Sequence, residues 1–113
     1  MYNSFEELDV WKRACGLAVK IYESLRNCHD YGFKDQMTRA AVSIASNIAE
    51  GAERNSKAEY IRFLHIAKGS AAELRTQVYI AQQIGVYQKY PNHRTRYRTE
   101  GNIIHASRPN QIP

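Results

Sequence analysis

Apolar residues recur at helical spacing in three segments of this chain, and the pattern stops near Val86. Positions three and four residues apart lie on one side of a helix, so this recurrence predicts amphipathic helices. No segment alternates between apolar and polar residues for long enough to predict a strand. The sequence therefore predicts an all-α, antiparallel up-and-down helical bundle over residues 1–87, with three long helices. An irregular basic tail over residues 88–113 takes the place of a fourth helix.

The first helix is predicted to begin with a capping box, in which Ser4 caps the helix and Glu7 reaches back. It is expected to end near Asn27, where residues typical of turns follow one another. Cys15 and Cys28 lie too far apart along such a helix to form a disulfide bond, so we expect buried or half-buried thiols. The expected apolar face consists of Leu8, Trp11, Cys15, Ala18, Tyr22 and Leu25.

The second helix is predicted over about residues 35–50, with Asp35 near the positive end of its dipole. Gly51 is expected just past its end. Many of its residues are small, and small side chains let helix axes approach closely, so we expect this helix in the middle of the bundle. Its apolar stripe is Met37, Ala41, Ile44 and Ile48, with Ala40, Ala45 and Ala49 beside it.

The third helix is predicted to start at a second capping box, Ser56 to Glu59, and to end at Ile84 and Gly85. A helix of this length spans about 40 Å. Its expected apolar face is Tyr60, Phe63, Leu64, Ala67, Ala71, Leu74, Val78 and Ala81. Across the three helices, the residues that we expect in the core are Trp11, Leu25, Ile44, Ile48, Phe63, Leu74 and Val78.

Three long helices leave apolar surface that a fourth antiparallel helix usually covers. The tail has few aliphatic residues, and Pro91, Gly101 and Pro109 interrupt any long helix there. Two alternatives follow. Either the tail packs on the bundle as an irregular strap, or other copies of the chain cover the remaining apolar surface.

Polar residues also recur at helical spacing on the second and third helices. If these helices are antiparallel neighbours, the two polar stripes meet in a hydrogen-bonded network that fixes their register. The alternative is that they are two solvated faces. The residues concerned are Arg39, Ser43, Asn47, Glu50, Ser70, Glu73 and Gln77.

The sequence offers little chemistry for an enzyme. Nothing forces Glu50 and Glu73 to the separation that an acid and base pair needs, and the Glu-x-x-His motif of di-metal helical bundles is absent. We therefore expect no catalytic residue, cofactor, metal site or small-molecule substrate. The sequence has no stretch of about 18 apolar residues, so we expect no membrane-spanning helix. The first residues lack the layout of a signal peptide, so we expect a cytoplasmic protein.

Residues 5–12, 35–40, 43–51 and 63–74 together resemble a bacterial family of four-helix-bundle proteins. The founding members of that family are encoded by intervening sequences inside 23S rRNA genes. The accessory variability protein of diversity-generating retroelements is similar. The runs Asn-Ile-Ala-Glu-Gly and Gly-Ser-Ala-Ala-Glu-Leu carry most of the resemblance, which covers about residues 4–87.

This resemblance implies an up-down-up-down bundle without known catalytic activity. It also implies a homo-oligomer, a ring of five bundles, and in the retroelement relative a basic surface that binds nucleic acid and a reverse transcriptase partner. Six of the polar residues match polar motif positions of the family, which favours a buried structural network: Ser43, Asn47, Glu50, Ser70, Glu73 and Gln77. After Tyr87 the sequence lacks the pattern of the family's fourth amphipathic helix. A frameshift or a divergent C-terminal end would explain this departure.

The tail carries most of the net charge of +5. Residues 88–113 have five Lys and Arg against one acidic residue, while residues 1–87 have 11 against 10. Arginines beside tyrosines offer phosphate contacts and stacking surfaces, so the tail is a candidate for RNA or DNA binding. The alternative is a solvated terminus without a role. The candidate contacts are Lys89, Arg94, Arg96 and Arg98.

Overall fold

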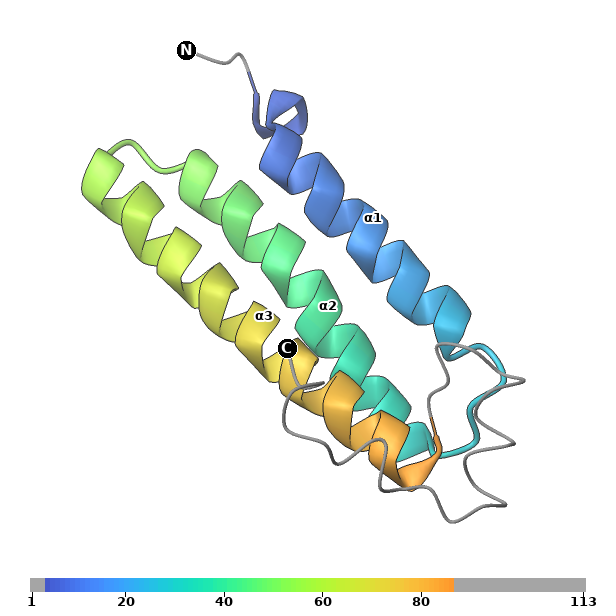
Figure 1. Cartoon of the computed structure of the whole chain (residues 1–113). Helices are drawn as coiled ribbons and strands as arrows, with labels where there is room; N and C mark the ends of the chain where they lie inside the picture. Colours follow the sequence, from blue (N-terminus) through green and yellow to red (C-terminus); the bar gives the residue numbers. More distant parts are fainter. Residues whose placement is uncertain (1–3, 87–113) are drawn as a thin grey trace.

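The structure is a computed structural model that describes residues 4–86, and within that range every regular element is helical. A short 3₁₀ turn (Phe5–Glu7) precedes α1 (Asp9–Ser24), α2 (Tyr31–Ala52) and α3 (Lys57–Ile84). Consecutive helices run antiparallel to each other, and α2 lies between α1 and α3 (Figure 1). The predicted all-α bundle is thus confirmed for the described part of the chain, while residues 88–113 lie outside it.

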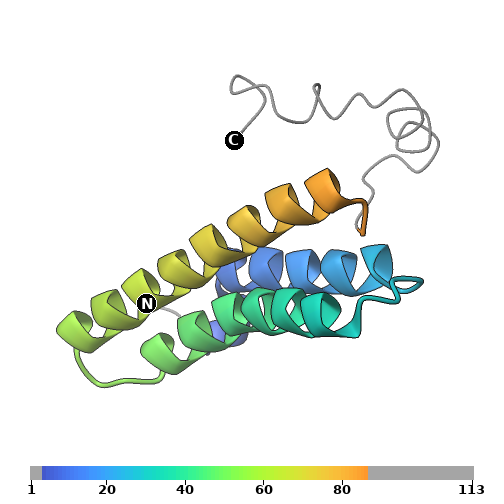
Figure 2. The same ribbon diagram turned by 90° about the horizontal axis from the view of Figure 1, so that it is seen from below.

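Alanine and glycine explain the central position of α2. Its neighbours approach closely on two sides, and Figure 2 shows α1 and α3 packed along its length. The predicted stripe from Met37 to Ile48 is buried, and Met37 and Ala41 are fully enclosed. Those residues form one apolar core with Leu25 of the turn after α1 and with Leu74 of α3.

The beginning of α1 differs from the predicted capping box. Ser4 makes no capping hydrogen bond with its side chain, and α1 begins only at Asp9, after an extended Leu8. Apolar contacts account for the difference. The Phe5 ring packs edge-on against Trp11, with 5.2 Å between ring centroids, and Leu8 packs against the core.

The buried face of α1 is also rotated from the predicted one. Ala14 and Ile21 lie in the core, whereas Tyr22, which we expected inside, is 52% exposed. Trp11 and Val78, both expected in the core, are only half-buried at its edge. Because α1 and α3 each pack mainly against α2, the buried face of each is narrow, and side chains at its margin remain partly exposed. The two cysteines are free and half-buried, as expected.

Both ends of α2 lie outside the predicted range. Asp30 caps the helix by accepting a hydrogen bond from the backbone N–H of Phe33 at 3.2 Å, so α2 begins at Tyr31 rather than near Asp35. At the other end, Gly51 is not a residue past the helix but a buried residue inside it. A Cβ atom at Gly51 would lie 2.6 Å from the Cβ of Phe63, so glycine here permits close packing of α2 on α3.

Two arginines complete this packing beside the turn between α2 and α3. The guanidinium groups of Arg54 and Arg62 lie 4.8 and 4.6 Å from the centre of the Phe63 ring. Each also forms an ion pair with a glutamate, Arg54 with Glu50 and Arg62 with Glu59. The turn is therefore held both by the apolar contact of Phe63 and by charge.

The predicted bounds of α3 are confirmed. Ser56 caps the helix by accepting a hydrogen bond from the backbone N–H of Glu59 at 3.1 Å. Gly85 ends it in the left-handed conformation, with φ of 82°, which glycine adopts without strain.

Removing the Ser56 cap tests this end of the helix. We expect Ser56→Ala to lower the free energy of unfolding by about 1 kcal/mol, because the N–H of Glu59 loses its acceptor. Ser4→Ala is the matched control and should change it by less than about 0.5 kcal/mol, because the Ser4 side chain caps nothing. Chemical denaturation followed by circular dichroism measures both. Equal losses in the two variants would contradict the assignment of the caps.

Candidate functional site

Three of the seven polar residues singled out in the sequence meet between α2 and α3. The Ser43 and Ser70 hydroxyl oxygens lie 2.9 Å apart across the two helices. Asn47 donates from Nδ2 to the Ser43 hydroxyl at 3.0 Å and to the Ser43 carbonyl at 2.8 Å. All three side chains are half-buried. This cluster links the two helices at one level and so favours one register between them.

Glu73 and Gln77 form a separate pair along α3. Gln77 is 6% exposed and donates from Nε2 to the Glu73 carboxylate at 3.4 Å, while Glu73 itself is exposed. The other amide atom of Gln77, Oε1, is buried and has no hydrogen-bond partner among the described residues. A buried acceptor without a donor costs about 1–3 kcal/mol, so residues 4–86 by themselves leave the end of this polar row unsatisfied.

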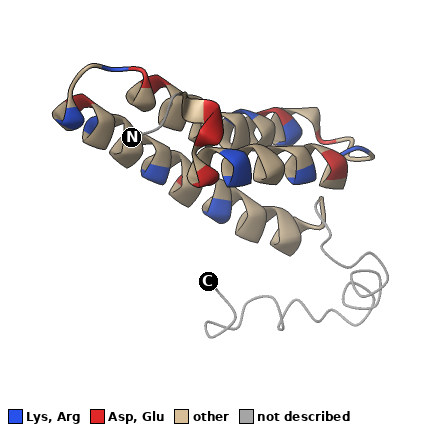
Figure 3. Ribbon diagram, turned by 90° about the horizontal axis from the view of Figure 1, so that it is seen from above, with Lys and Arg blue, Asp and Glu red and all other residues tan. Residues whose placement is uncertain are grey.

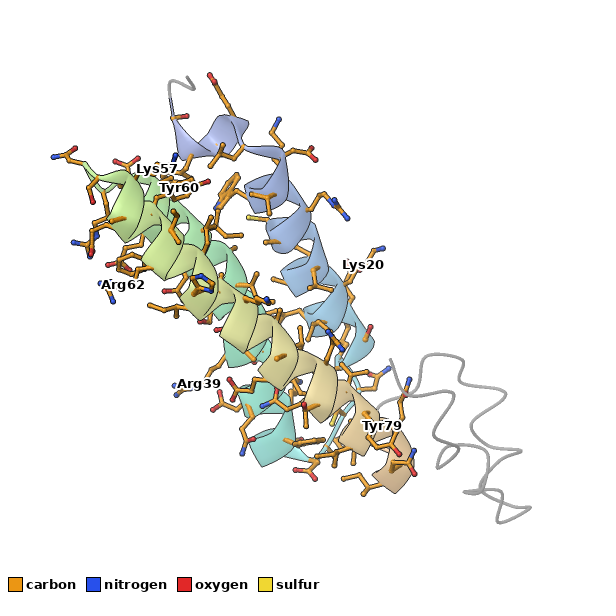
Figure 4. All side chains as sticks on the ribbon, turned by 60° about the vertical axis from the view of Figure 1, so that its left-hand side comes forward. Lys20, Arg39, Lys57, Tyr60, Arg62 and Tyr79 are labelled. Carbon is orange, nitrogen blue, oxygen red and sulfur yellow. The ribbon has the colours of Figure 1, made fainter. Side chains whose placement is uncertain are left out.

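The remaining two residues face solvent in local ion pairs. Arg39 pairs with Asp35 at 3.0 Å, and Glu50 pairs with Arg54 at 3.0 Å; all four side chains are at least 43% exposed. Figure 4 shows Arg39 and Arg62 projecting on the side of the bundle away from α1. The structure thus divides the seven residues into a cluster between helices, a pair on α3 and two surface ion pairs.

A double-mutant cycle measures the contact between Ser43 and Ser70. We expect Ser43→Ala and Ser70→Ala each to lower the free energy of unfolding, and the coupling energy between them to be about 0.5–1.5 kcal/mol. Ser46→Ala, an exposed serine on the same helix, is the control for a change of side chain alone. Strict additivity in the Ser43 and Ser70 cycle would show that the two hydroxyls do not interact.

Glu50 and Glu73, the two carboxylates considered as an acid and base pair, are not joined in the described part of the chain. Glu50 bonds to Arg54 and Glu73 to Gln77, and no hydrogen bond joins the two carboxylates to each other. Within residues 4–86, no group of three or more His, Cys, Asp or Glu is placed to hold a metal ion. A hydrogen bond from Arg62 lowers the pKa of Glu59, which keeps that exposed carboxylate charged at the start of α3.

The sequence analysis did not single out several exposed apolar residues of α1 and α3. Ile66, Ile80 and Ile84 of α3 are 40–59% exposed, and at helical spacing they extend the row of Ser70, Glu73 and Gln77, in which Ser70 is half-buried and Gln77 buried. We define this row as the α3 stripe: Ile66, Ser70, Glu73, Gln77, Ile80 and Ile84. On α1, Val19 and Tyr22 are 55% and 52% exposed. We define the row through them as the α1 stripe: Cys15, Val19, Tyr22 and Arg26.

A signal for both stripes was present in the sequence. The spacing in the α3 stripe is four, three, four, three and four residues, and in the α1 stripe it is four, three and four. This is the spacing with which one helix packs along another. The sequence analysis named Ser70, Glu73, Gln77, Cys15 and Tyr22 at this spacing, but it did not extend either row to the aliphatic residues Ile66, Ile80, Ile84 and Val19.

The candidate nucleic-acid contacts Lys89, Arg94, Arg96 and Arg98 lie outside the described residues. Within residues 4–86, basic and acidic positions occur on all three helices (Figure 3). None of the described helices combines the length and the apolar character that crossing a membrane requires.

Comparison with known proteins identifies the family. No curated protein matches the chain. A family model described as "23S rRNA-intervening sequence protein" matches residues 6–105. We expected the resemblance to end near residue 87, and the match continues through residue 105, into the segment that we took to depart from the family pattern. Since the match covers most of the chain, this protein belongs to the 23S rRNA-intervening sequence protein family.

Proposed function

We propose that this chain is a cytoplasmic, non-enzymatic helical-bundle protein that self-associates and binds RNA, DNA or a protein that processes nucleic acid. The observation that carries self-association is the amount of apolar surface that three helices leave open. Every helix exposes large apolar side chains by 39% or more. They are Val10, Leu17, Val19, Tyr22, Tyr31, Val42, Ile61, Ile66, Ile80 and Ile84.

Association between copies is the simplest use of such a surface. Scattered apolar residues are ordinary on a protein surface, but rows of them at heptad spacing are typical of helix pairing. Family membership agrees with this, and the resemblance drawn from the sequence implies a ring of five copies. We therefore propose a homo-oligomer, with a pentamer as its expected form.

Charge supports the nucleic-acid part of the proposal. The surplus of basic residues lies mainly in residues 88–113, which carry five Lys and Arg against one acidic residue. A few cations on a single chain bind phosphates weakly and in a salt-sensitive way. In an oligomer several such tails act on one nucleic acid, so avidity raises the affinity without any new contact.

A scaffold that binds no nucleic acid is the alternative function. The interhelical cluster of Ser43, Asn47 and Ser70 favours it, because the hydrogen bonds of that cluster join side chains within the bundle and so stabilise the fold. The two functions differ in one measurable property. The first requires salt-dependent affinity for RNA or DNA, and the scaffold does not.

The first experiment is the molar mass of the purified full chain by size exclusion coupled to light scattering. We expect a discrete oligomer several times the 13.0 kDa of one chain. A monomer at micromolar concentration would contradict self-association.

The second experiment titrates fluorescent single-stranded RNA into the full chain and into a chain that ends at Tyr87, at several salt concentrations. We expect weaker binding and a smaller salt slope for the shorter chain, because it lacks the basic tail. Absence of binding by the full chain would leave the scaffold function. Equal binding by both chains would exclude the tail from the interaction.

A further inference from the structure

We propose that α3 carries a nucleic-acid contact surface on the folded bundle, formed by a row of basic residues on its solvent side. This inference rests on the proposed affinity for RNA or DNA, and it adds a contact surface in the described part of the chain, separate from the basic residues of 88–113. We define this surface as the basic row: Lys57, Ile61, His65, Lys68, Ala72, Arg75 and Tyr79.

Spacing places the basic row on one side of α3. Successive members are four, four, three, four, three and four residues apart, so all seven lie within a sector of about 80° around the helix axis. Six members are exposed, and Tyr79 is half-buried. Figure 4 shows Lys57 and Tyr79 near the two ends of α3. The row therefore extends over most of the longest of the three described helices.

The charge of the basic row has one sign. Lys57, Lys68 and Arg75 supply three cations, and the row contains no acidic residue. The two glutamates of α3, Glu59 and Glu73, lie outside its sector. The ion pairs within residues 4–86 involve other basic side chains, so the three cations have no acidic partner there.

The distances between the cations favour an extended polyanion as the ligand. The helical rise places Lys57 and Arg75 about 27 Å apart along the axis, with Lys68 about 10 Å from the nearer of the two. A small anion or a single acidic side chain therefore contacts only one of the three cations. A nucleic-acid duplex carries one charge for about every 1.7 Å of its axis, so one molecule reaches all three.

The other members of the row favour nucleic acid over a protein helix or a lipid surface. Ile61 is the only large aliphatic residue among the seven, and both of those partners bind through a broad apolar face. Tyr79 presents part of an aromatic ring, on which a base can stack. It lies toward the C-terminal end of α3, after which the basic residues of 88–113 follow in the sequence.

Charge reversal within the row tests the proposal. Fluorescent single-stranded RNA is titrated into the full chain and into the double variant Lys68→Glu with Arg75→Glu, at several salt concentrations. We expect the variant to bind about tenfold more weakly and with a salt slope smaller by about 1–2, because two phosphate contacts are lost. Both residues are exposed, so its helical circular dichroism and light-scattering mass should equal those of the unchanged chain.

The matched control reverses the same two residue types on the outer side of α1. Arg13→Glu with Lys20→Glu changes the net charge by the same amount, both residues are exposed, and Figure 4 shows Lys20 projecting away from α3. This control should bind RNA nearly as tightly as the unchanged chain. Equal weakening in the two double variants would show that net charge governs binding, and it would overturn the basic row as a contact surface.

Three further results would also overturn the basic row. RNA affinity unchanged in the row variant would leave binding to other residues of the chain. A loss of light-scattering mass together with affinity would assign the row to a contact between copies. Binding of poly-glutamate as tightly as RNA of equal charge would assign it to acidic polypeptides. Absence of RNA binding by the unchanged chain would instead overturn the nucleic-acid function on which this inference rests.

Discussion

Ile48→Asp should prevent the chain from folding. Ile48 is 3% exposed in the C-terminal part of α2, within the core that all three helices share. An aspartate there places an unpaired carboxylate in an apolar interior and also removes most of the apolar volume. Burial of an unpaired charge is among the few changes that cost more than about 4 kcal/mol, which approaches the whole stability of a small domain. We expect loss of the cooperative thermal transition in circular dichroism.

The control for this variant lies on the same helix. Ser46→Asp introduces the same side chain two residues away, at an exposed position, and should keep a transition close to that of the unchanged chain. If Ile48→Asp melts like Ser46→Asp, the side of α2 that we assign to the core is wrong.

Gly51→Ala should destabilise the bundle although alanine is the better helix former. The added Cβ would lie 2.6 Å from the Cβ of Phe63 and 3.2 Å from the backbone oxygen of Tyr60. Neither atom is the free end of a flexible side chain, so α2 and α3 must move apart at this point. We expect a net loss of about 1–3 kcal/mol in the free energy of unfolding. Urea denaturation of the unchanged chain and of Gly51→Ala measures this difference.

Gly69 is the matched control for Gly51. It also lies inside a helix, but a Cβ atom there meets nothing within 4 Å. Gly69→Ala should therefore raise the free energy of unfolding by about 0.5–1 kcal/mol through helix propensity alone. Opposite signs for the two substitutions would locate the close packing at Gly51. A gain of stability at both positions would contradict it.

The helices themselves were predictable because each has a strong period and a local end signal. Ser56 and Gly85 mark the ends of α3 through chemistry within three residues, so that helix was predicted with its observed bounds. Gly51 has the sequence appearance of a residue after a helix, yet its role depends on Phe63, twelve residues away on another helix. Contacts between helices are not encoded in local spacing, and the prediction therefore failed there.

The side chains on α1 and α3 show a second limit. Tyr22 and Ile21 both fit an apolar row, and only the position of α2 decides that Ile21 is buried and Tyr22 exposed. Ser70 and Gln77 belong to one row of polar residues, but Ser70 hydrogen-bonds to Ser43 of α2, whereas Gln77 hydrogen-bonds to Glu73 of its own helix. Spacing predicts which residues share a face of a helix; the neighbouring helices decide how each member is used.

The packing around Phe63 also has a consequence for the order in which the chain folds. Gly51, Arg54, Arg62 and Phe63 come together within twelve residues of one another in sequence, so the loop that must close is short. Contacts of short sequence separation form early, because little chain entropy is lost before they are made. We expect α2 and α3 to form the folding nucleus as a helical hairpin, with α1 docking afterwards. Substitutions beside Phe63 should then slow folding, whereas substitutions on α1 should mainly accelerate unfolding.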